Sequence, residues 1–184
     1  IPRNYNFHRY YARTENDWSG TAFRNVINDN GGGYVYHVGH ANTDYVAGWY
    51  VYNITDDTFD KLNGTEHNYD FFHSHGCVCG DFSSTCILET MVNVSTGVVA
   101  ATGNSRYGWY IPWGDGPARH LNRELVDSYY NDRLQYIGTA FEEMKMMTAP
   151  LVNFYGKDNG ALRWNIYCIN IIGDVAVSPW LDEP

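Results

Sequence analysis

A cysteine between two glycines, a few residues after an aromatic run, constrains the fold of this chain most strongly. The run at residues 69–72 predicts a short strand, and the sequence then breaks at Gly76, presents Cys77 and breaks again at Gly80. A helical pattern opens at Ser83. A side chain between a strand and a helix lies at the carboxyl edge of an α/β sheet, where such sheets bind ligands. Cys77 is therefore a candidate functional residue.

A second strand pattern ends in a similar way at a histidine. Residues 34–38 predict a strand, which is followed by Gly39 and His40. A histidine and a cysteine that each close a strand predict the dyad of a cysteine peptidase, in which the imidazole activates the thiol and later protonates the leaving amine. The turns at Ala41 and Cys77 would supply backbone amides to stabilise the oxyanion.

Each of these residues also has an alternative interpretation. Cys77 could be a buried structural thiol, and His40 could be a turn residue bonded to the backbone. In addition, His73, His75, Cys77 and Cys79 are spaced by two, which on an extended strand places them on one face and suggests a zinc site. Alternate residues of one strand rarely surround a tetrahedral ion, and the glycines indicate that the extended run ends near Cys77. The dyad is therefore the leading hypothesis.

The composition is that of a globular, acidic protein. The 184 residues are 44% hydrophobic and 18% charged, which predicts one ordered domain. The formal net charge is −9 and no basic stripe is visible, so nucleic acid is excluded as an expected partner. No apolar run reaches the length of about 18 residues that spans a membrane. Four cysteines are too few for a disulfide scaffold, and the sixteen tyrosines with three lysines favour an extracytoplasmic location.

Strand and helix patterns alternate along the chain. Helical patterns begin near residues 19, 83, 117 and 139, and strand patterns cover residues 34–38, 69–72, 96–103 and 162–172. The helix near residue 139 is expected to start with a capping box of Thr139 and Glu142. Residues 42–68 are polar and turn-rich, and predict an excursion over the surface. The alternation predicts an α/β fold with a mainly parallel sheet covered by helices on both faces.

An aromatic loop at residues 104–113 follows the third predicted strand and contains Trp109 and Trp113. Aromatic side chains in such a position can line a substrate pocket. They can equally pack over the edge of a core, and the loop alone does not decide between the two.

Together, these motifs resemble the gingipain-type cysteine peptidases. The resemblance rests on Gly39-His40, on residues 76–82 with Cys86 and Glu89, on residues 103–109 and 115–117, and on residues 163–164 and 170–174. It runs from about residue 20 to residue 180 in family order. It implies a caspase-like α/β/α sandwich with a mainly parallel sheet, and an endopeptidase that hydrolyses peptide bonds through a thioester acyl-enzyme.

The resemblance also implies roles for particular residues. It makes His40 the general acid and base, Cys77 the nucleophile, and the amides of Ala41 and Cys77 the oxyanion hole. It places Trp109 and Trp113 near the pocket for the residue before the scissile bond. It implies a protein or peptide substrate, a secreted or cell-surface location, and no cofactor for the chemistry, while structural calcium is compatible with it.

The chain departs from the family pattern at two places. Ala41 stands where the family has glycine after the histidine, and residues 173–175 read Gly-Asp-Val where the family has Gly-Asp-Pro. Family catalytic domains begin well upstream of the histidine and carry an acidic specificity residue there. We therefore expect residues 1–184 to be one domain that forms the C-terminal portion of a catalytic domain. A preceding segment or a separate chain would complete it.

Two other function classes remain open from the sequence. The chain could be an inactive family member that acts as a binding module, because a motif does not report turnover. It could also be a sortase-like transpeptidase, a role for which the family has members.

Overall fold

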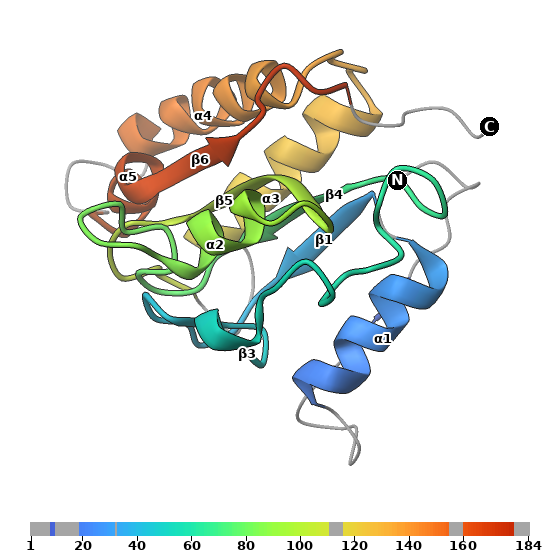
Figure 1. The fold of residues 1–184 in the computed structure, drawn as a ribbon. Coiled ribbons are helices and arrows are strands. Elements are labelled where there is room, and N and C mark those ends of the chain that lie inside the picture. The colour runs from blue at the N-terminus through green and yellow to red at the C-terminus, as the bar shows by residue number, and fades with distance from the viewer. Residues whose placement is uncertain (1–7, 10–18, 32, 111–115, 155–159, 179–184) are drawn as a thin grey trace.

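A four-stranded sheet in the order β1-β4-β5-β6 forms the centre of the structure. The strands are β1 (Tyr34–His37), β4 (Asp70–Ser74), β5 (Val98–Asn104) and β6 (Ile169–Gly173). The first three are parallel, and β6 pairs antiparallel with β5. The structure is a computed structural model that describes residues 8–9, 19–31, 33–110, 116–154 and 160–178. The predicted mainly parallel sheet is confirmed (Figure 1).

Five α-helices surround this sheet in the described residues: α1 (Gly20–Asn30), α2 (Ile87–Asn93), α3 (Pro117–Tyr130), α4 (Ile137–Phe154) and α5 (Gly160–Cys168). A small antiparallel hairpin of β2 (Tyr45–Val46) and β3 (Trp49–Tyr50) leads into a 3-10 helix, η1 (Val51–Asn53). In the described ranges, no helix combines the length and the apolar character that crossing a bilayer requires.

Two hydrophobic layers flank the sheet and make it a sandwich. Side chains of α1, α2 and the segment between β2 and β4 pack on one face, around Phe72. Side chains of α3 and α4 pack on the other face, around Phe71. Phe71 and Phe72 are neighbours on β4, so they point to opposite faces and are both buried. The predicted cover of helices on both faces is therefore confirmed (Figure 1).

Local sequence signals set the helix starts that were predicted. Ser19 caps α1, since its hydroxyl oxygen accepts a hydrogen bond of 3.0 Å from the Ala22 amide. Gly31 ends this helix with a φ of +64°, which favours glycine. Pro117 occupies the first position of α3, where the missing N–H of proline costs nothing.

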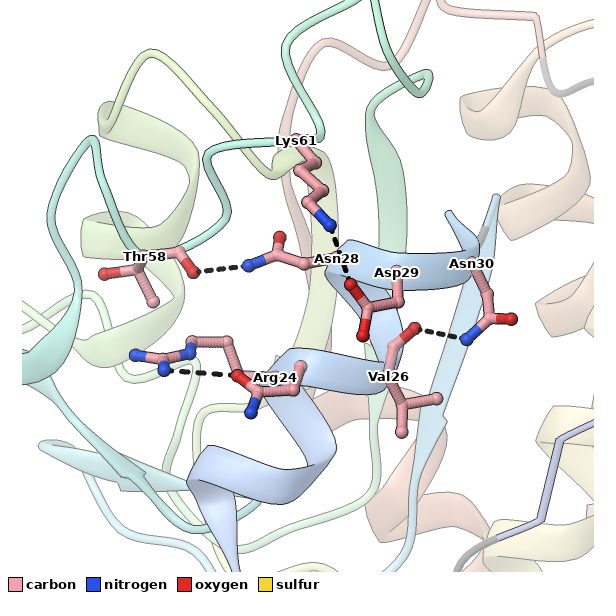
Figure 2. A network of polar contacts seen from close by, with 8 residues as sticks. Arg24, Val26, Asn28, Asp29, Asn30, Thr58 and Lys61 are labelled. Carbon is pink, nitrogen blue, oxygen red and sulfur yellow. Dashed lines mark hydrogen bonds and ion pairs between the residues drawn. The ribbon is translucent and has the colours of Figure 1, made fainter.

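Polar contacts tie α1 to the turn that precedes β4 (Figure 2). The Asn28 amide donates a hydrogen bond of 3.2 Å to the Thr58 carbonyl, and Lys61 forms an ion pair of 2.7 Å with Asp29. The first contact is buried and the second is exposed to solvent, so the first contributes more to stability.

The segment at residues 42–68 is more than an excursion over the surface. Its apolar side chains Val46, Trp49, Ile54, Phe59 and Leu62 are buried in the core that covers one face of the sheet. The Trp49 indole also donates a hydrogen bond of 2.7 Å to a carbonyl of α1. The prediction was wrong because the buried residues are spaced irregularly among turn residues and show no period.

Two of the predicted boundaries near the C-terminus were also wrong. Residues 162–168 belong to helix α5 and only Ile169–Gly173 form a strand. The helix buries Leu162, Asn165 and Cys168, three residues apart, whereas the sequence pattern was interpreted as an alternation. Likewise, α4 begins at Ile137, so Thr139 lies inside the helix and does not cap it.

Candidate active site

The register of β1 and β4 brings the two predicted catalytic residues to the same edge of the sheet. The strands are parallel neighbours, and His37 lies directly opposite Ser74. The His75 amide continues this ladder with a bond of 3.1 Å to the His37 carbonyl. His40 and Cys77 each follow three residues after the paired positions. Both therefore lie in the turns that leave adjacent strands at their carboxyl ends.

The two turns touch each other. A β-carbon on Gly76 would collide with the β-carbon of Ala41 and would lie 3.4 Å from the Gly39 carbonyl. Glycine at position 76 thus leaves the space that the Ala41 methyl group occupies. This contact shows how the chain accommodates alanine where the gingipain pattern has glycine.

Cys77 is the one cysteine of this chain that solvent partly reaches; Cys79, Cys86 and Cys168 are buried. Burial raises the pKa of Cys79 to about 11 and that of Cys168 to about 11, and it also raises the pKa of Cys86. Since the thiolate is the nucleophile, these three thiols stay protonated and unreactive at neutral pH. Exposure therefore selects Cys77 among the four thiols.

His40 is exposed and makes no hydrogen bond to any described residue, including Cys77. The Cys77 sulfur lies 4.0 Å from the Gly108 carbonyl oxygen. Catalytic hydrogen bonds are often long in enzymes without substrate and shorten when it binds. The structure thus places His40 and Cys77 on adjacent turns, and their roles in a dyad stay a prediction.

The turn after Cys77 is held in a strained conformation. Val78 has a φ of +58°, in the left-handed region that β-branched residues avoid. Its amide donates a hydrogen bond of 3.0 Å to the Arg106 carbonyl, which helps to hold it there. Such a conformation costs about 1–3 kcal/mol and is typical of functional turns.

A buried serine at the end of β4, Ser74, makes hydrogen bonds that hold the same turn. The Ser74 hydroxyl oxygen accepts a hydrogen bond of 3.0 Å from the Gly76 amide and one of 3.6 Å from the Cys79 thiol. It lies 2.9 Å from Nδ1 of His37, to which it can donate its own proton. Burial lowers the pKa of His37 to about 4, so this imidazole is neutral and Nδ1 is free to accept. The sequence analysis did not identify this role of Ser74.

Asn104 orients the peptide group that contains the Cys77 amide. Its side-chain amide donates a hydrogen bond of 3.1 Å to the Gly76 carbonyl, and its side-chain oxygen accepts one of 3.3 Å from the Cys168 thiol. In a trans peptide the carbonyl and the following N–H point in opposite directions. Because the Gly76 carbonyl points toward Asn104, the Cys77 N–H of the same peptide group points away from Asn104. Sequence reasoning placed Asn104 in an aromatic loop and in residues 103–109 of the family pattern, and missed this contact.

The two predicted oxyanion donors are available for hydrogen bonding. Neither the Ala41 amide nor the Cys77 amide donates to an acceptor in the described part of the chain. Buried or half-buried amides are normally paired, so two unpaired amides on touching turns are suited to bind a ligand oxygen. Their role as an oxyanion hole stays a prediction.

The loop that carries Trp109 is fixed beside the thiol. The Asn165 side chain accepts a bond of 3.1 Å from the Trp109 amide and donates one of 3.1 Å to its carbonyl. A β-carbon on Gly108 would collide with the His75 carbonyl, so the loop lies directly against the end of β4. Trp109 is 54% exposed, although its backbone amide and carbonyl are both bonded to Asn165. Trp113, the second predicted substrate-binding residue, lies outside the described residues.

The zinc interpretation required four side chains on one face of an extended strand, and the structure does not provide them. Strand β4 ends at Ser74, and Cys79 lies beside the hydroxyl of Ser74. His73 and His75 instead form a buried pair with 2.9 Å between their Nε2 atoms. Among the residues that the structure describes, no three His, Cys, Asp or Glu side chains form a candidate metal site.

The buried histidine pair is electrically neutral. Burial lowers the pKa of His73 well below its usual value, and it lowers that of His75 to about 3. His73 also bonds to the Thr102 hydroxyl, so both of its ring nitrogens have partners. Nδ1 of His75 is buried without a partner among the described residues.

Comparison with known proteins agrees with this architecture. The profile of Peptidase family C25 matches residues 1–180, so the chain belongs to this family, the gingipain family of cysteine peptidases. A solved structure titled "Structure of Protease" is similar with a TM-score of 0.57 at 14% identity, which shows the fold alone. The match covers 85% of this chain and 37% of that one, so the chain spans well under half of the similar protein. No curated protein matches significantly.

Proposed function

We propose that the chain contributes the catalytic residues of a cysteine endopeptidase, with Cys77 as nucleophile and His40 as general acid and base. One observation carries the proposal. The only partly exposed thiol of the chain lies at the carboxyl end of β4, on a turn that touches the turn after His40. Membership of Peptidase family C25 supports it.

The reaction would proceed in two stages. His40 takes the proton of the Cys77 thiol, and the sulfur attacks the carbonyl carbon of the scissile bond. The amides of Ala41 and Cys77 stabilise the oxyanion. The carbon–nitrogen bond then breaks as His40 gives its proton to the leaving amine, which leaves a thioester on Cys77. In the second stage His40 accepts a proton from water and the hydroxide attacks the thioester carbon. The carbon–sulfur bond then breaks, the acid product leaves, and His40 returns its proton to the Cys77 sulfur.

We propose that Trp109, and Trp113 outside the described residues, contact the substrate residue before the scissile bond. The exposure of Trp109, and the contact of the Cys77 sulfur with the carbonyl of the preceding Gly108, support this role. A preceding segment or a separate chain would form the remaining wall. In the described residues β1 is an edge strand, paired only with β4, and it offers such a segment a place to bind.

A secreted or cell-surface location and structural calcium are proposals from the family alone.

A transpeptidase would use the same thioester but transfer it to an amine. The test is to incubate the protein with a peptide substrate and an excess of a glycine peptide, and to weigh the products by mass spectrometry. We expect the free acid as the main product, because the exposed His40 leaves water access to the thioester. A ligated peptide as the main product would assign transfer, and no product even when the preceding segment is co-expressed would assign an inactive binding module.

Two buried asparagines should affect different kinetic constants. Asn104→Ala frees the peptide group that contains the Cys77 amide. We expect kcat to fall by about tenfold, the effect of one lost hydrogen bond in the transition state, and KM to stay nearly unchanged. Asn165→Ala frees the backbone of Trp109, so KM should rise and kcat change less. Steady-state kinetics of both variants would measure this. Equal changes in both constants for both variants would contradict the assigned roles.

A further inference from the structure

The thiol of Cys168 is buried beside the candidate site, and the proposed reaction does not use it. Cys168 is the last residue of α5 and directly precedes β6. Asn104 lies opposite Ile169 in the antiparallel ladder of β5 and β6, so the junction of α5 and β6 reaches the edge of the sheet where Cys77 follows β4 (Figure 1). Cys168 is 5% exposed. Any role in the reaction must therefore be exerted through another residue.

The backbone at Cys168 is held by three hydrogen bonds, and its thiol donates one to Asn104. The Cys168 carbonyl accepts bonds of 2.8 Å from the Ser105 amide, 3.1 Å from the Ser105 hydroxyl and 3.1 Å from the Asn170 side chain. The sulfur lies 3.3 Å from Oδ1 of Asn104 and 3.8 Å from the Asn165 carbonyl. Both oxygens can only accept, so the thiol is the donor. Burial raises the pKa of this thiol to about 11, so it keeps its proton at neutral pH.

This hydrogen bond favours one of the two orientations of the Asn104 amide. Oδ1 faces the thiol, and the side-chain nitrogen donates 3.1 Å to the Gly76 carbonyl. In the part of the chain that the structure describes, the Cys168 thiol is the one donor to Oδ1. Asn104 is completely buried, so without the thiol proton Oδ1 would be an unpaired buried acceptor, which is unfavourable. Asn104 would then gain by moving, and its bond to Gly76 would weaken.

The Gly76 carbonyl connects this amide to the candidate site. The same peptide group contains the Cys77 N–H, which donates to no acceptor in the described ranges. In the proposed function this N–H stabilises the oxyanion. Because a peptide group is planar, a rotation that moves the carbonyl also moves the N–H. The contact between Cys168 and Asn104 therefore bears on the direction of a donor that acts in the transition state.

We propose that Cys168 is a positioning residue of the peptidase: its thiol holds Oδ1 of Asn104, and the Asn104 nitrogen holds the Gly76–Cys77 peptide group with its N–H directed at the oxyanion. This inference deepens the proposed function and rests on it. It gives a role in the reaction to a buried thiol that does not touch the substrate.

Alanine and serine at position 168 separate this role from simple packing, because both are smaller than cysteine and only serine can donate. We expect Cys168→Ala to lower kcat by about three- to fivefold with KM nearly unchanged. The effect should be smaller than that of Asn104→Ala, since a thiol is a weak donor and Asn104 keeps its own bond to Gly76. Cys168→Ser should restore kcat to within about twofold. Steady-state kinetics on one peptide substrate, with the preceding segment co-expressed, would measure this.

A double variant and a control make the test specific. In Asn104→Ala protein, Cys168→Ala should not lower kcat further, because its effect passes through Asn104. Cys86→Ala is the matched control for the loss of a buried thiol. Cys86 is also fully buried, but its side chain accepts a hydrogen bond from the Glu89 amide at the start of α2. We expect Cys86→Ala to lower stability and to leave kcat unchanged.

The remaining outcomes also decide the matter. If Cys168→Ser is as slow as Cys168→Ala, or if Cys168→Ala lowers kcat equally with and without Asn104, the inference is wrong while the peptidase function stands. If the unmodified protein cleaves no peptide, the proposed function fails instead. The position of the peptide group is then followed by NMR through the amide signal of Cys77. Cys168→Ala should shift this signal more than Cys168→Ser does, and an unchanged signal in Cys168→Ala would overturn the inference.

Discussion

Replacing Cys77 by alanine should abolish peptide cleavage, with a loss of several orders of magnitude in kcat. The reason is that the covalent intermediate cannot form without the nucleophile, and the remaining binding groups cannot replace it. The half-exposed position of Cys77 on a strained turn supports its assignment over the other three cysteines. Hydrolysis of a fluorogenic peptide, followed over hours, would measure the residual rate.

Cys79→Ala is the matched control for this experiment, because it removes the neighbouring thiol. Cys79 is fully buried and burial raises its pKa to about 11, so it should contribute no thiolate. We expect the variant to retain most of its activity, with some loss of stability from the cavity and from the missing contact to Ser74. Loss of activity in Cys79→Ala together with full activity in Cys77→Ala would reassign the nucleophile.

Acid should destabilise the fold strongly as the pH falls below about 6.5. In and directly after the sheet strands there are three neutral histidines: burial lowers the pKa of His37 to about 4 and of His75 to about 3, and it lowers that of His73 well below its usual value. In the unfolded chain these groups titrate near 6.5. Between about pH 6.5 and pH 4 the unfolded chain therefore binds protons that the folded chain does not, and unfolding becomes more favourable.

The expected loss is large for a domain of this size. Each histidine contributes up to about 1.4 kcal/mol per pH unit, so the three together can remove several kcal/mol from a total of roughly 5–15 kcal/mol. Urea unfolding at a series of pH values would give the slope. His37→Asn keeps an acceptor for Ser74 but removes one titrating group, so the slope should decrease by about one proton. A free energy of unfolding that is constant from pH 7 to pH 4 would contradict the account.

The sequence predicted the elements of this site that have a local signature. Gly76 and Gly80 mark the turn around Cys77, and the apolar runs before and after it gave the parallel strands. Ser19 and Pro117 marked the starts of α1 and α3. Each of these signals acts over a few residues, so it can be recognised without knowing the rest of the fold.

The supporting residues could not be predicted in this way. Asn104 acts on a carbonyl 28 residues away, and Asn165 acts on a backbone segment 56 residues away. In the sequence both are ordinary polar residues. The same limit explains why residues 162–168 were predicted as a strand. One of the three buried positions of α5 is the polar Asn165, so the helical spacing of its buried residues cannot be recognised, and the apolar residues alternate as in a strand. Long-range polar contacts decided these positions, and a local pattern does not contain them.

The most direct test of the central claim is to identify the residue that carries the acyl-enzyme. The protein is mixed with a peptide ester that acylates quickly, quenched in acid after short times, and analysed by intact mass and by peptide mapping. The account predicts a transient mass increase equal to the acyl group, located on Cys77, which is absent in Cys77→Ala and strongly reduced in His40→Ala. Peptide turnover without an adduct on Cys77, or with an adduct on another residue, would contradict it.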